Sequence, residues 1–216
     1  EEAPAEETPP EPAAAAAEVS VGGDRSVLIL FGSQSGNGED LCMKFGKNAS
    51  TYDLEATVKG MDEVQIGDLA GWKRILIVCS TWGEGDMPDN AEDLWVAANT
   101  DAAPSMAGSH FSVLALGDTS YEFYCQSGKD WDGWMEKQGA TRLVDRVDCD
   151  VDYDALANSW IADAFPHVAA VDGEGVFQND SVEAFRAKAT GGKAAVAAGS
   201  AFDLPEVERA ELQVDV

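Results

Sequence analysis

Residues 27–38 have the sequence VLILFGSQSGNG, which joins a short apolar run to a loop of small polar residues. A continuous apolar run that ends in turn residues is typical of a strand buried on both faces of a parallel sheet. The apolar residues Leu41, Phe45 and Ala49 follow at helical spacing. A loop between a strand and a helix N-terminus presents free backbone N–H groups and the positive end of the helix dipole, which favour a bound phosphate. We therefore expect a phosphate site here, although an ordinary strand-to-helix turn would have the same local pattern.

The rest of the chain repeats this alternation of strand and helix. Apolar runs predict four further strands, at residues 54–58, 74–79, 111–116 and 141–147. Helical patterns are found at 38–50, from 89 onward, at 129–138 and at 153–165, the last ending before Pro166, with a short helix within 61–69. The alternation predicts an α/β fold with a five-stranded parallel sheet in the flavodoxin-like order 2-1-3-4-5 and helices on both faces. Ligand loops would then follow the first, third and fourth strands.

Composition divides the chain into three parts. Residues 1–23 are rich in glutamate, proline and alanine, which predicts a disordered tail or linker. Residues 24–171 carry the strand and helix patterns and are expected to form one flavodoxin-like domain. Residues 172–216 are expected to be a C-terminal tail or linker, with one helical patch at 182–189. Because the chain begins with Glu1, we expect it to be part of a longer polypeptide.

The chain is strongly acidic, with a formal net charge of −26 at pH 7. Residues 24–171 alone carry −15, so the charge belongs to the domain as well as to its tails. This balance argues against nucleic acid and anionic membranes as partners and favours a basic protein face. Solubility alone would also account for an acidic surface.

The cysteines and histidines do not have the spacing of a metal site. The four cysteines lack C-x-x-C spacing, and the sequence has only two histidines. Free thiols of this kind indicate the cytoplasm or another reducing compartment. No apolar run has the length of a membrane span or the pattern of a signal peptide.

The polar loops differ from common nucleotide-binding motifs. The first loop has no lysine, and Leu41 stands where a dinucleotide fingerprint needs its third glycine. The second and third loops each carry an aromatic residue among small residues, Trp82 and Tyr121 respectively. Two aromatics from different loops can stack on a flat ring. A phosphate site beside an aromatic slot, without an acid–base pair or a nucleophile, predicts a carrier of flavin mononucleotide (FMN).

Three segments resemble the FMN-binding segments of the diflavin reductase family, and most closely those of its sulfite reductase flavoproteins. They are FGSQSGNG at 31–38, CSTWGEGDMPDNA at 79–91 and LGDTSYEFYC at 116–125. The stretch LVDRVDCDVDY at 143–153 is similar as well. The resemblance covers about residues 25–168, with the motifs in the expected order.

The resemblance implies which residues hold FMN. Those implied at the phosphate are Ser33, Gln34, Ser35, Gly36, Asn37 and Gly38. Those implied at the edge of the isoalloxazine ring are Ser80, Thr81, Trp82 and Gly83, with the Gly83 backbone near flavin N5. Those implied in the second wall, with Tyr121 stacked on the ring, are Leu116, Gly117, Asp118, Thr119, Ser120, Tyr121, Glu122, Phe123, Tyr124 and Cys125. An acidic flavin contact is implied at Asp148, Asp150 or Asp152.

The resemblance also implies the FMN domain of an NADPH-dependent diflavin-type oxidoreductase. FMN would take electrons from an FAD/NADPH-binding reductase module, in the same chain or separate, and pass them singly to a haem or iron–sulfur acceptor. Such a domain needs no catalytic side chain and no metal of its own. Acidic residues near the loops would steer a basic-faced acceptor, or would form only a solvated face: Asp86, Asp89, Glu92, Asp93, Asp118 and Glu122.

Two further functions are weighed against this one. A stand-alone flavodoxin-like carrier that serves a separate reductase remains an alternative. A signalling receiver on the same fold needs an acidic pair after the first strand, an aspartate ending the third and a lysine after the fifth. Those places hold Gly32-Ser33, Cys79-Ser80 and Val147-Asp148, which excludes a receiver.

Overall fold

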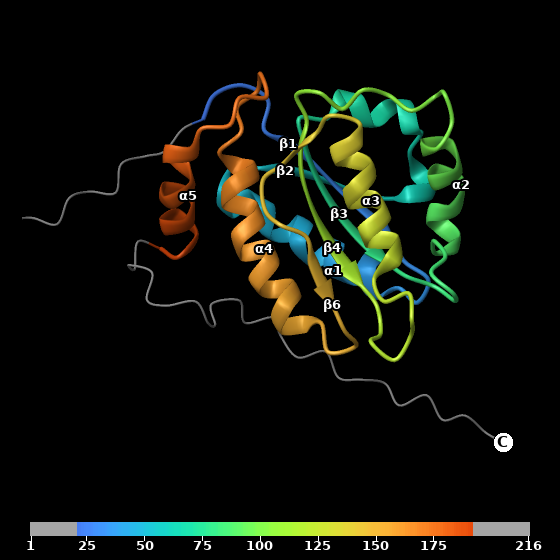
Figure 1. The fold of residues 1–216 in the computed structure, drawn as a ribbon. Coiled ribbons are helices and arrows are strands. Elements are labelled where there is room, and N and C mark those ends of the chain that lie inside the picture. The colour runs from blue at the N-terminus through green and yellow to red at the C-terminus, as the bar shows by residue number, and fades with distance from the viewer. Residues whose placement is uncertain (1–20, 192–216) are drawn as a thin grey trace, which may run out of the picture.

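The computed structural model describes residues 21–191, and the tails expected at 1–20 and 192–216 lie outside the described residues. A parallel sheet forms its centre, with the strand order β2-β1-β3-β4-β5 (Figure 1). The strands are β1 (Ser26–Gly32), β2 (Glu55–Gly60), β3 (Arg74–Ser80), β4 (His110–Leu116), β5 (Thr141–Arg142) and β6 (Val147–Cys149), of which β6 also pairs with β4. The expected fold class and strand order are therefore confirmed.

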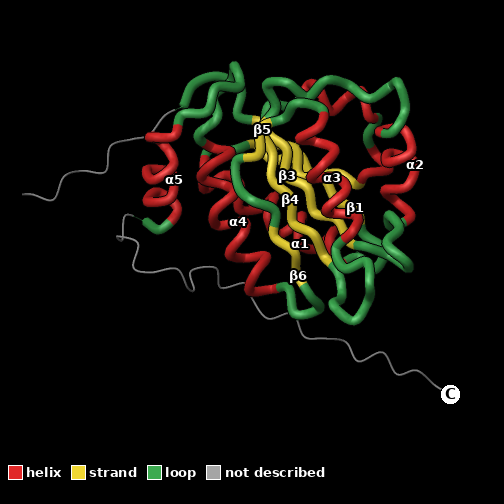
Figure 2. The backbone as a smooth tube through the Cα atoms, viewed as in Figure 1, coloured by secondary structure: helices red, strands yellow, loops and turns green. Residues whose placement is uncertain are grey.

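Helices cover both faces of the sheet, as Figure 2 shows with the strands in yellow between red helices. The helices are α1 (Asn37–Asn48), α2 (Asp89–Ala98), α3 (Gln126–Lys137), α4 (Asp154–Ala169) and α5 (Val182–Ala189). Successive strand residues point to opposite faces, so Ile29 packs in the core beneath α1 and α4 while Leu30 packs in the core beneath α2 and α3. Burial on both faces explains why most residues of β1, β3 and β4 are apolar.

The fifth strand is not the continuous 141–147 strand that the sequence predicts. It is split into β5 and β6, and between them the Leu143 N–H still donates to the Phe111 carbonyl (2.9 Å) while the Val144 carbonyl accepts from the Ser112 hydroxyl (3.0 Å). Asp132 of α3 is nearly buried, and its carboxylate accepts hydrogen bonds from Arg142 (2.8 and 3.0 Å) and Arg146 (2.8 Å). Arg142 of β5 and Arg146, which precedes β6, therefore share one partner on α3.

The last predicted helix was expected to end before Pro166, and this boundary is wrong. Helix α4 continues through Pro166 to Ala169. A proline within a helix loses one backbone hydrogen bond. The ring is tolerated here because Pro166 lies in the last turn and is buried against the core together with Phe165 and Val168.

Two other boundaries differ from the predicted ones. Helix α1 ends at Asn48 and is followed by the 3₁₀ helix η1 (Ala49–Tyr52). The expected short helix at 61–69 is a pair of 3₁₀ helices, η2 (Met61–Glu63) and η3 (Ile66–Gly71), that bury Met61 and Leu69.

Packing continues beyond residue 171, the expected end of the domain. Val171 pairs with Phe177, and the 3₁₀ helix η4 (Asn179–Ser181) leads into α5, where the sequence predicts a helical patch. Phe185 of α5 is fully buried in the core beneath α1 and α4. Lys188 of α5 forms an ion pair with Asp53 (2.5 Å).

The amino end of the sheet is closed by a buried arginine. The Arg74 guanidinium donates to the carbonyls of Asp24 (2.8 Å), Ser26 (3.0 Å), Val168 (3.1 Å) and Val171 (2.5 Å). These bonds tie the start of β1 to the end of α4.

Candidate cofactor site

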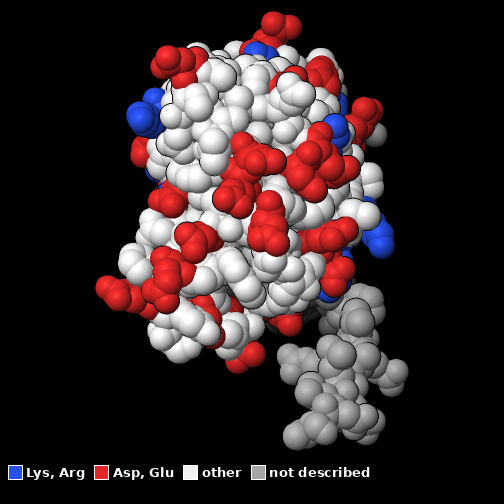
Figure 3. All heavy atoms as spheres, turned by 90° about the vertical axis from the view of Figure 1, so that its right-hand side faces the viewer, with Lys and Arg blue, Asp and Glu red and all other residues white. Residues whose placement is uncertain are grey.

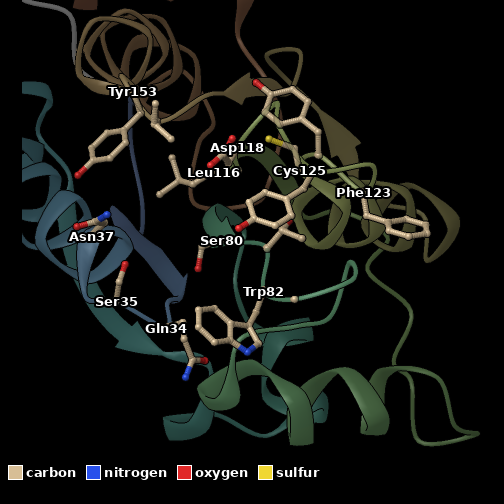
Figure 4. Close-up of a pocket in the computed structure, with 16 residues that line it drawn as sticks. Gln34, Ser35, Asn37, Ser80, Trp82, Leu116, Asp118, Phe123, Cys125 and Tyr153 are labelled. Carbon is tan, nitrogen blue, oxygen red and sulfur yellow. The ribbon is translucent and has the colours of Figure 1, made fainter.

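A cavity of about 560 Å³ lies at the carboxyl edge of the sheet, where the loops after β1, β3, β4 and β6 converge (Figure 4). Ligand pockets for small molecules have volumes in this range. The residues that line it are Gln34, Ser35, Asn37, Ser80, Thr81, Trp82, Gly83, Leu116, Gly117, Asp118, Tyr121, Phe123, Tyr124, Cys125, Val151 and Tyr153. The cavity stands at the place where doubly wound sheets bind their ligands.

The loop after β1 leads into α1, and a hydrogen bond to the start of α2 holds it in place. The Ser33 N–H donates to Asn90 Oδ1 (2.8 Å), and the Ser33 hydroxyl accepts from the N–H groups of Gly36 (3.1 Å) and Gly38 (3.2 Å). Gly36 has φ +89°, a left-handed conformation that favours glycine, at the position where α1 begins. The loop therefore curls over the first turn of α1, so that it lies at the helix N-terminus, where a phosphate cradle is expected.

Gln34 connects the first loop to the second. Its Nε2 donates to Asp89 Oδ2 (3.0 Å), and its Oε1 accepts from the Asp89 N–H (2.8 Å) at the start of α2. This pair of bonds fixes one wall of the cavity on a helix terminus.

The loop after β3 is a tight turn that presents Trp82. The N–H groups of Trp82 and Asp86 exchange hydrogen bonds with each other's carbonyls (2.9 and 2.8 Å). The Trp82 side chain is 54% exposed at the cavity. Gly83 has φ +50°, a conformation that glycine adopts at little cost. A Cβ on Gly85 would lie 2.9 Å from Phe123 Cβ, so this glycine lets the second and third loops touch.

The loop after β4 presents Tyr121, 61% exposed, and leads into α3. Its first turn is closed by Asp118, whose carboxylate accepts the Ser120 N–H (2.8 Å) and the Ser120 hydroxyl. Cys125 ends the loop in a left-handed conformation, with φ +58°. Burial raises the pKa of the Cys125 thiol to about 11, so the thiol stays neutral at neutral pH. It is an apolar wall of the cavity rather than a nucleophile.

A fourth wall comes from the connection between β6 and α4. Val151 and Tyr153 line the cavity, and the Tyr153 ring packs against the core beneath α4. In Figure 4 Tyr153 stands on the same side of the cavity as Asn37 and Ser35, with Trp82 across from them. The loop holds its place through Asp150, whose carboxylate accepts from the Thr119 N–H (3.0 Å) and hydroxyl (2.5 Å).

The structure brings most of the expected site residues to this one cavity. The expected residues outside the lining set are Ser33, Gly36, Gly38, Thr119, Ser120 and Glu122. Several of these shape the loops from behind, as the bonds of Ser33, Ser120 and Thr119 show. The sequence analysis missed Val151 and Tyr153 as lining residues. The signal that pointed to them was that both follow a strand, but that strand was expected to end at 147, two residues before β6 ends.

Charge near the cavity is unusual for a phosphate site. None of the described residues that line it is a lysine or an arginine. Lys129 lies nearby, but it donates to the Tyr124 carbonyl (2.5 Å), lies over the Tyr124 ring (5.4 Å) and is 4.0 Å from Asp148. A phosphate here must therefore be held by backbone N–H, hydroxyl and amide groups.

The described residues contain no cluster of histidine, cysteine and acidic side chains that could hold a metal ion. No described helix is long and apolar enough to cross a membrane. The donors present do fit FMN, because a helix N-terminus with small polar residues lies at one side and two exposed aromatics lie at the other. Bound FMN supplies the chemistry of accepting electrons in pairs and releasing them one at a time.

Comparison with known proteins gives the family of the chain. The family model for flavodoxin matches residues 29–160. The alpha-component of sulfite reductase [NADPH] flavoprotein from Shewanella oneidensis is 42% identical over 144 residues, which are 67% of this chain and 24% of that protein. Its counterpart from Bacillus subtilis is also 42% identical, over 63% of this chain and 23% of that protein. The chain thus spans about a quarter of the length of these curated relatives.

Solved structures show the same fold. A cysteine-to-alanine mutant of flavodoxin from Pseudomonas aeruginosa superimposes with a TM-score of 0.55 and 26% identity, over 63% of this chain and 94% of that one. Oxidised flavodoxin 1 from Bacillus cereus superimposes with a TM-score of 0.54 at 22% identity, over 63% of this chain and 92% of that one, a likeness of fold alone. The chain belongs to the flavodoxin family, with FMN as its cofactor and the sulfite reductase flavoproteins among its relatives.

Proposed function

We propose that this domain transfers electrons, taking them from an FAD/NADPH-binding reductase module and passing them singly to a haem or iron–sulfur acceptor. The observation that carries the proposal is an aromatic slot open at the protein surface. Trp82 and Tyr121 both line the cavity and both expose more than half of their side chains. A flavin between them would have an accessible edge, which transfer to another protein requires.

The chain's own residues would bind and orient the cofactor and take no part in bond-making. The first loop, with Ser35, Asn37 and the first turn of α1, would hold the phosphate through neutral donors. Trp82 and Tyr121 would clasp the ring, and Gly83 would offer its backbone at the ring edge. The buried thiol of Cys125 and the side chain of Leu116 would keep water from the inner end of the slot.

The names of the relatives support a reductase context. They are flavoprotein components of NADPH sulfite reductases, and this chain matches about a quarter of each. By that likeness, the domain works with a reductase module that lies in the same polypeptide or in a separate one. The four buried, unpaired cysteines suit a reducing compartment such as the cytoplasm.

The acceptor is expected to present a basic face. Exposed acids stand on the second loop and on α2 beside the cavity, among them Glu84, Asp86, Glu92 and Asp93. Figure 3 shows the side of the molecule to the right in Figure 1, where α2 lies, with far more red acidic groups than blue basic ones. Such a surface attracts a positively charged partner at long range.

The test begins with the purified protein and its absorption spectrum. We expect a yellow protein that releases one FMN and little FAD, and that is reduced by NADPH only when a diflavin-type reductase module is added. A colourless protein that ignores FMN would refute cofactor binding. A protein that binds FMN but passes no electrons to a haem or haem–iron–sulfur acceptor would refute the transfer role.

A stand-alone carrier is the second candidate, because the likeness to Pseudomonas flavodoxin covers 94% of that protein. The two candidates differ in the donor. A fused module predicts that electrons arrive at a rate independent of domain concentration, whereas a separate reductase predicts a rate proportional to it.

A further inference from the structure

Pairing between β4 and β6 ends at Leu116 and Cys149, at the rim of the cavity. One more backbone bond follows, from the Gly117 N–H to the Cys149 carbonyl (2.9 Å). Beyond this bond the two segments of the chain diverge, and the side chain of Asp150 provides the contact between them. The Asp150 carboxylate accepts the Thr119 N–H on Oδ1 (3.0 Å) and the Thr119 hydroxyl on Oδ2 (2.5 Å).

The same carboxylate also fixes its own strand. Asp150 Oδ1 accepts the Val151 N–H at 2.8 Å, so both oxygens are engaged by protein donors. These hydrogen bonds, chiefly those from Thr119, lower the pKa of Asp150, and the carboxylate is charged at neutral pH. A charged acceptor makes stronger hydrogen bonds than a neutral one.

The contact joins two walls of the cavity. Thr119 stands two residues before Tyr121, while Val151 and Tyr153 follow Asp150 directly. Tyr121 and Val151 are each 61% exposed, so few packing contacts hold their loops. The Asp150–Thr119 bonds join these two loops through a side chain at this rim.

We propose that Asp150 is a positioning residue of the FMN site, which clamps the Tyr121 loop to the β6–α4 connection and so sets the width of the ring slot. It acts through Thr119 rather than by touching the flavin. Its neighbour Asp148 has a different task, since its carboxylate pairs with Arg146 (2.6 Å). The proposal rests on the assignment of this cavity to FMN.

The test is a double-mutant cycle on FMN binding, with Asp150→Ala, Thr119→Val and the combination. We expect Asp150→Ala to weaken FMN binding about tenfold and Thr119→Val about threefold, since one hydrogen bond of the pair survives in the latter. The combination should be no weaker than Asp150→Ala alone, because the two residues act through one contact. Thr119→Ser keeps both donors and should bind within about twofold of wild type.

A second readout separates positioning from folding. The fluorescence of the bound flavin at saturation should rise in Asp150→Ala and Thr119→Val and stay at the wild-type level in Thr119→Ser, because a loosened Tyr121 stacks less well. Urea unfolding of each apoprotein shows whether a variant is folded. If Asp150→Ala does not fold, the comparison of Thr119→Val with Thr119→Ser decides the question.

A matched control exists at the other edge of the sheet. The Asp172 carboxylate accepts the N–H groups of Glu174 (3.0 Å) and Val176 (2.9 Å) and the Gln178 amide (3.1 Å), next to the amino end of β1. Asp172→Ala removes a similar set of bonds and should leave the FMN dissociation constant unchanged. Wild-type affinity and fluorescence in Asp150→Ala, or additive effects in the cycle, would overturn the clamp. A wild-type protein that binds no FMN would instead overturn the proposed function.

Discussion

Tyr121 exposes 61% of its side chain although it lies among small polar residues on a loop. A large aromatic side chain in this position buries little of its surface in the fold, whereas stacking on a flat ligand would bury its ring. We expect Tyr121→Ala to weaken FMN binding by about 1–3 kcal/mol, the value of burying and stacking one aromatic ring. Titration of the apoprotein with FMN, followed by flavin fluorescence, measures it.

The control for Tyr121 is Leu156→Ala, which removes an exposed apolar side chain of α4 that does not line the cavity. Its dissociation constant should equal that of wild type. Trp82→Ala should cost less than Tyr121→Ala if the Trp82 side of the ring is the one that faces redox partners. An unchanged constant in Tyr121→Ala would place the ring elsewhere.

The thiols of Cys125 and Cys149 should make the free energy of unfolding depend on pH. Burial raises their pKa values to about 11 and about 12, whereas an unfolded cysteine titrates near 8.5. The fold thus favours the neutral thiols, and this stabilisation is complete below about pH 8.5 and is lost as the pH rises through 11. We expect the free energy of unfolding to fall between pH 9 and pH 11, measured with urea, and to fall less steeply in Cys125→Ala.

Labelling with iodoacetamide checks the same point independently. At pH 8 all four cysteines are buried, so the native protein should react slowly and the unfolded protein quickly. Rapid native labelling of Cys125 at pH 8 would contradict a neutral, enclosed thiol.

At the scale of elements, we expect Asp132 of α3 to hold the segment between β5 and β6 in place. Its side chain is 7% exposed and pairs with both Arg142 and Arg146. We expect Asp132→Ala to destabilise the protein by roughly 3 kcal/mol, because it leaves two partly buried guanidinium groups without their shared partner. Urea unfolding measures the loss, and hydrogen exchange should quicken at residues 143–149.

Glu136→Ala is the matched control, since Glu136 pairs with Arg142 from the same helix but is 66% exposed. Exposed pairs contribute at most about 1 kcal/mol. Equal losses in the two variants would show that Asp132 does not hold the segment.

The limits of prediction from sequence are visible in these same elements. The strand order follows from the alternation of apolar runs and was predicted correctly. The split of the fifth strand could not be predicted from sequence, because a period-2 pattern carries no information about an aspartate on a neighbouring helix. Its misplaced end in turn hid Val151 and Tyr153, which a strand ending at 147 leaves away from the rim. The end of α4 was predicted wrongly at Pro166, because burial of the ring in the core outweighs the local preference of proline to end a helix.

At the scale of the whole molecule, charge should govern association with an acceptor. Residues 24–171 carry −15, and the screening length falls from ~30 Å at 0.01 M salt to ~8 Å at 0.15 M. We expect Glu84→Gln with Glu92→Gln to lower the rate of electron transfer at low salt and to flatten its dependence on salt. Stopped-flow reduction of a haem-containing acceptor across ionic strengths measures this.

A pair of exposed acids far from the cavity serves as the control. Glu174 and Asp180 lie beyond α4, in the segment that joins the amino end of the sheet to α5. Glu174→Gln with Asp180→Asn removes the same charge and should change the rate less, because attraction matters most where the docking patch lies. A larger effect from this distant pair would show that the acidic face is only a solvated surface and does not steer the acceptor.

The absence of lysine and arginine from the described lining of the cavity has a practical consequence for handling the protein. A doubly charged phosphate would enter a domain that is itself strongly negative, where the described lining offers it only neutral donors. Ions shield that repulsion. Added salt should therefore strengthen the binding of FMN, while it weakens association with a basic partner. Buffers rich in salt should therefore keep the protein yellow during chromatography, and dialysis into dilute buffer should bleach it.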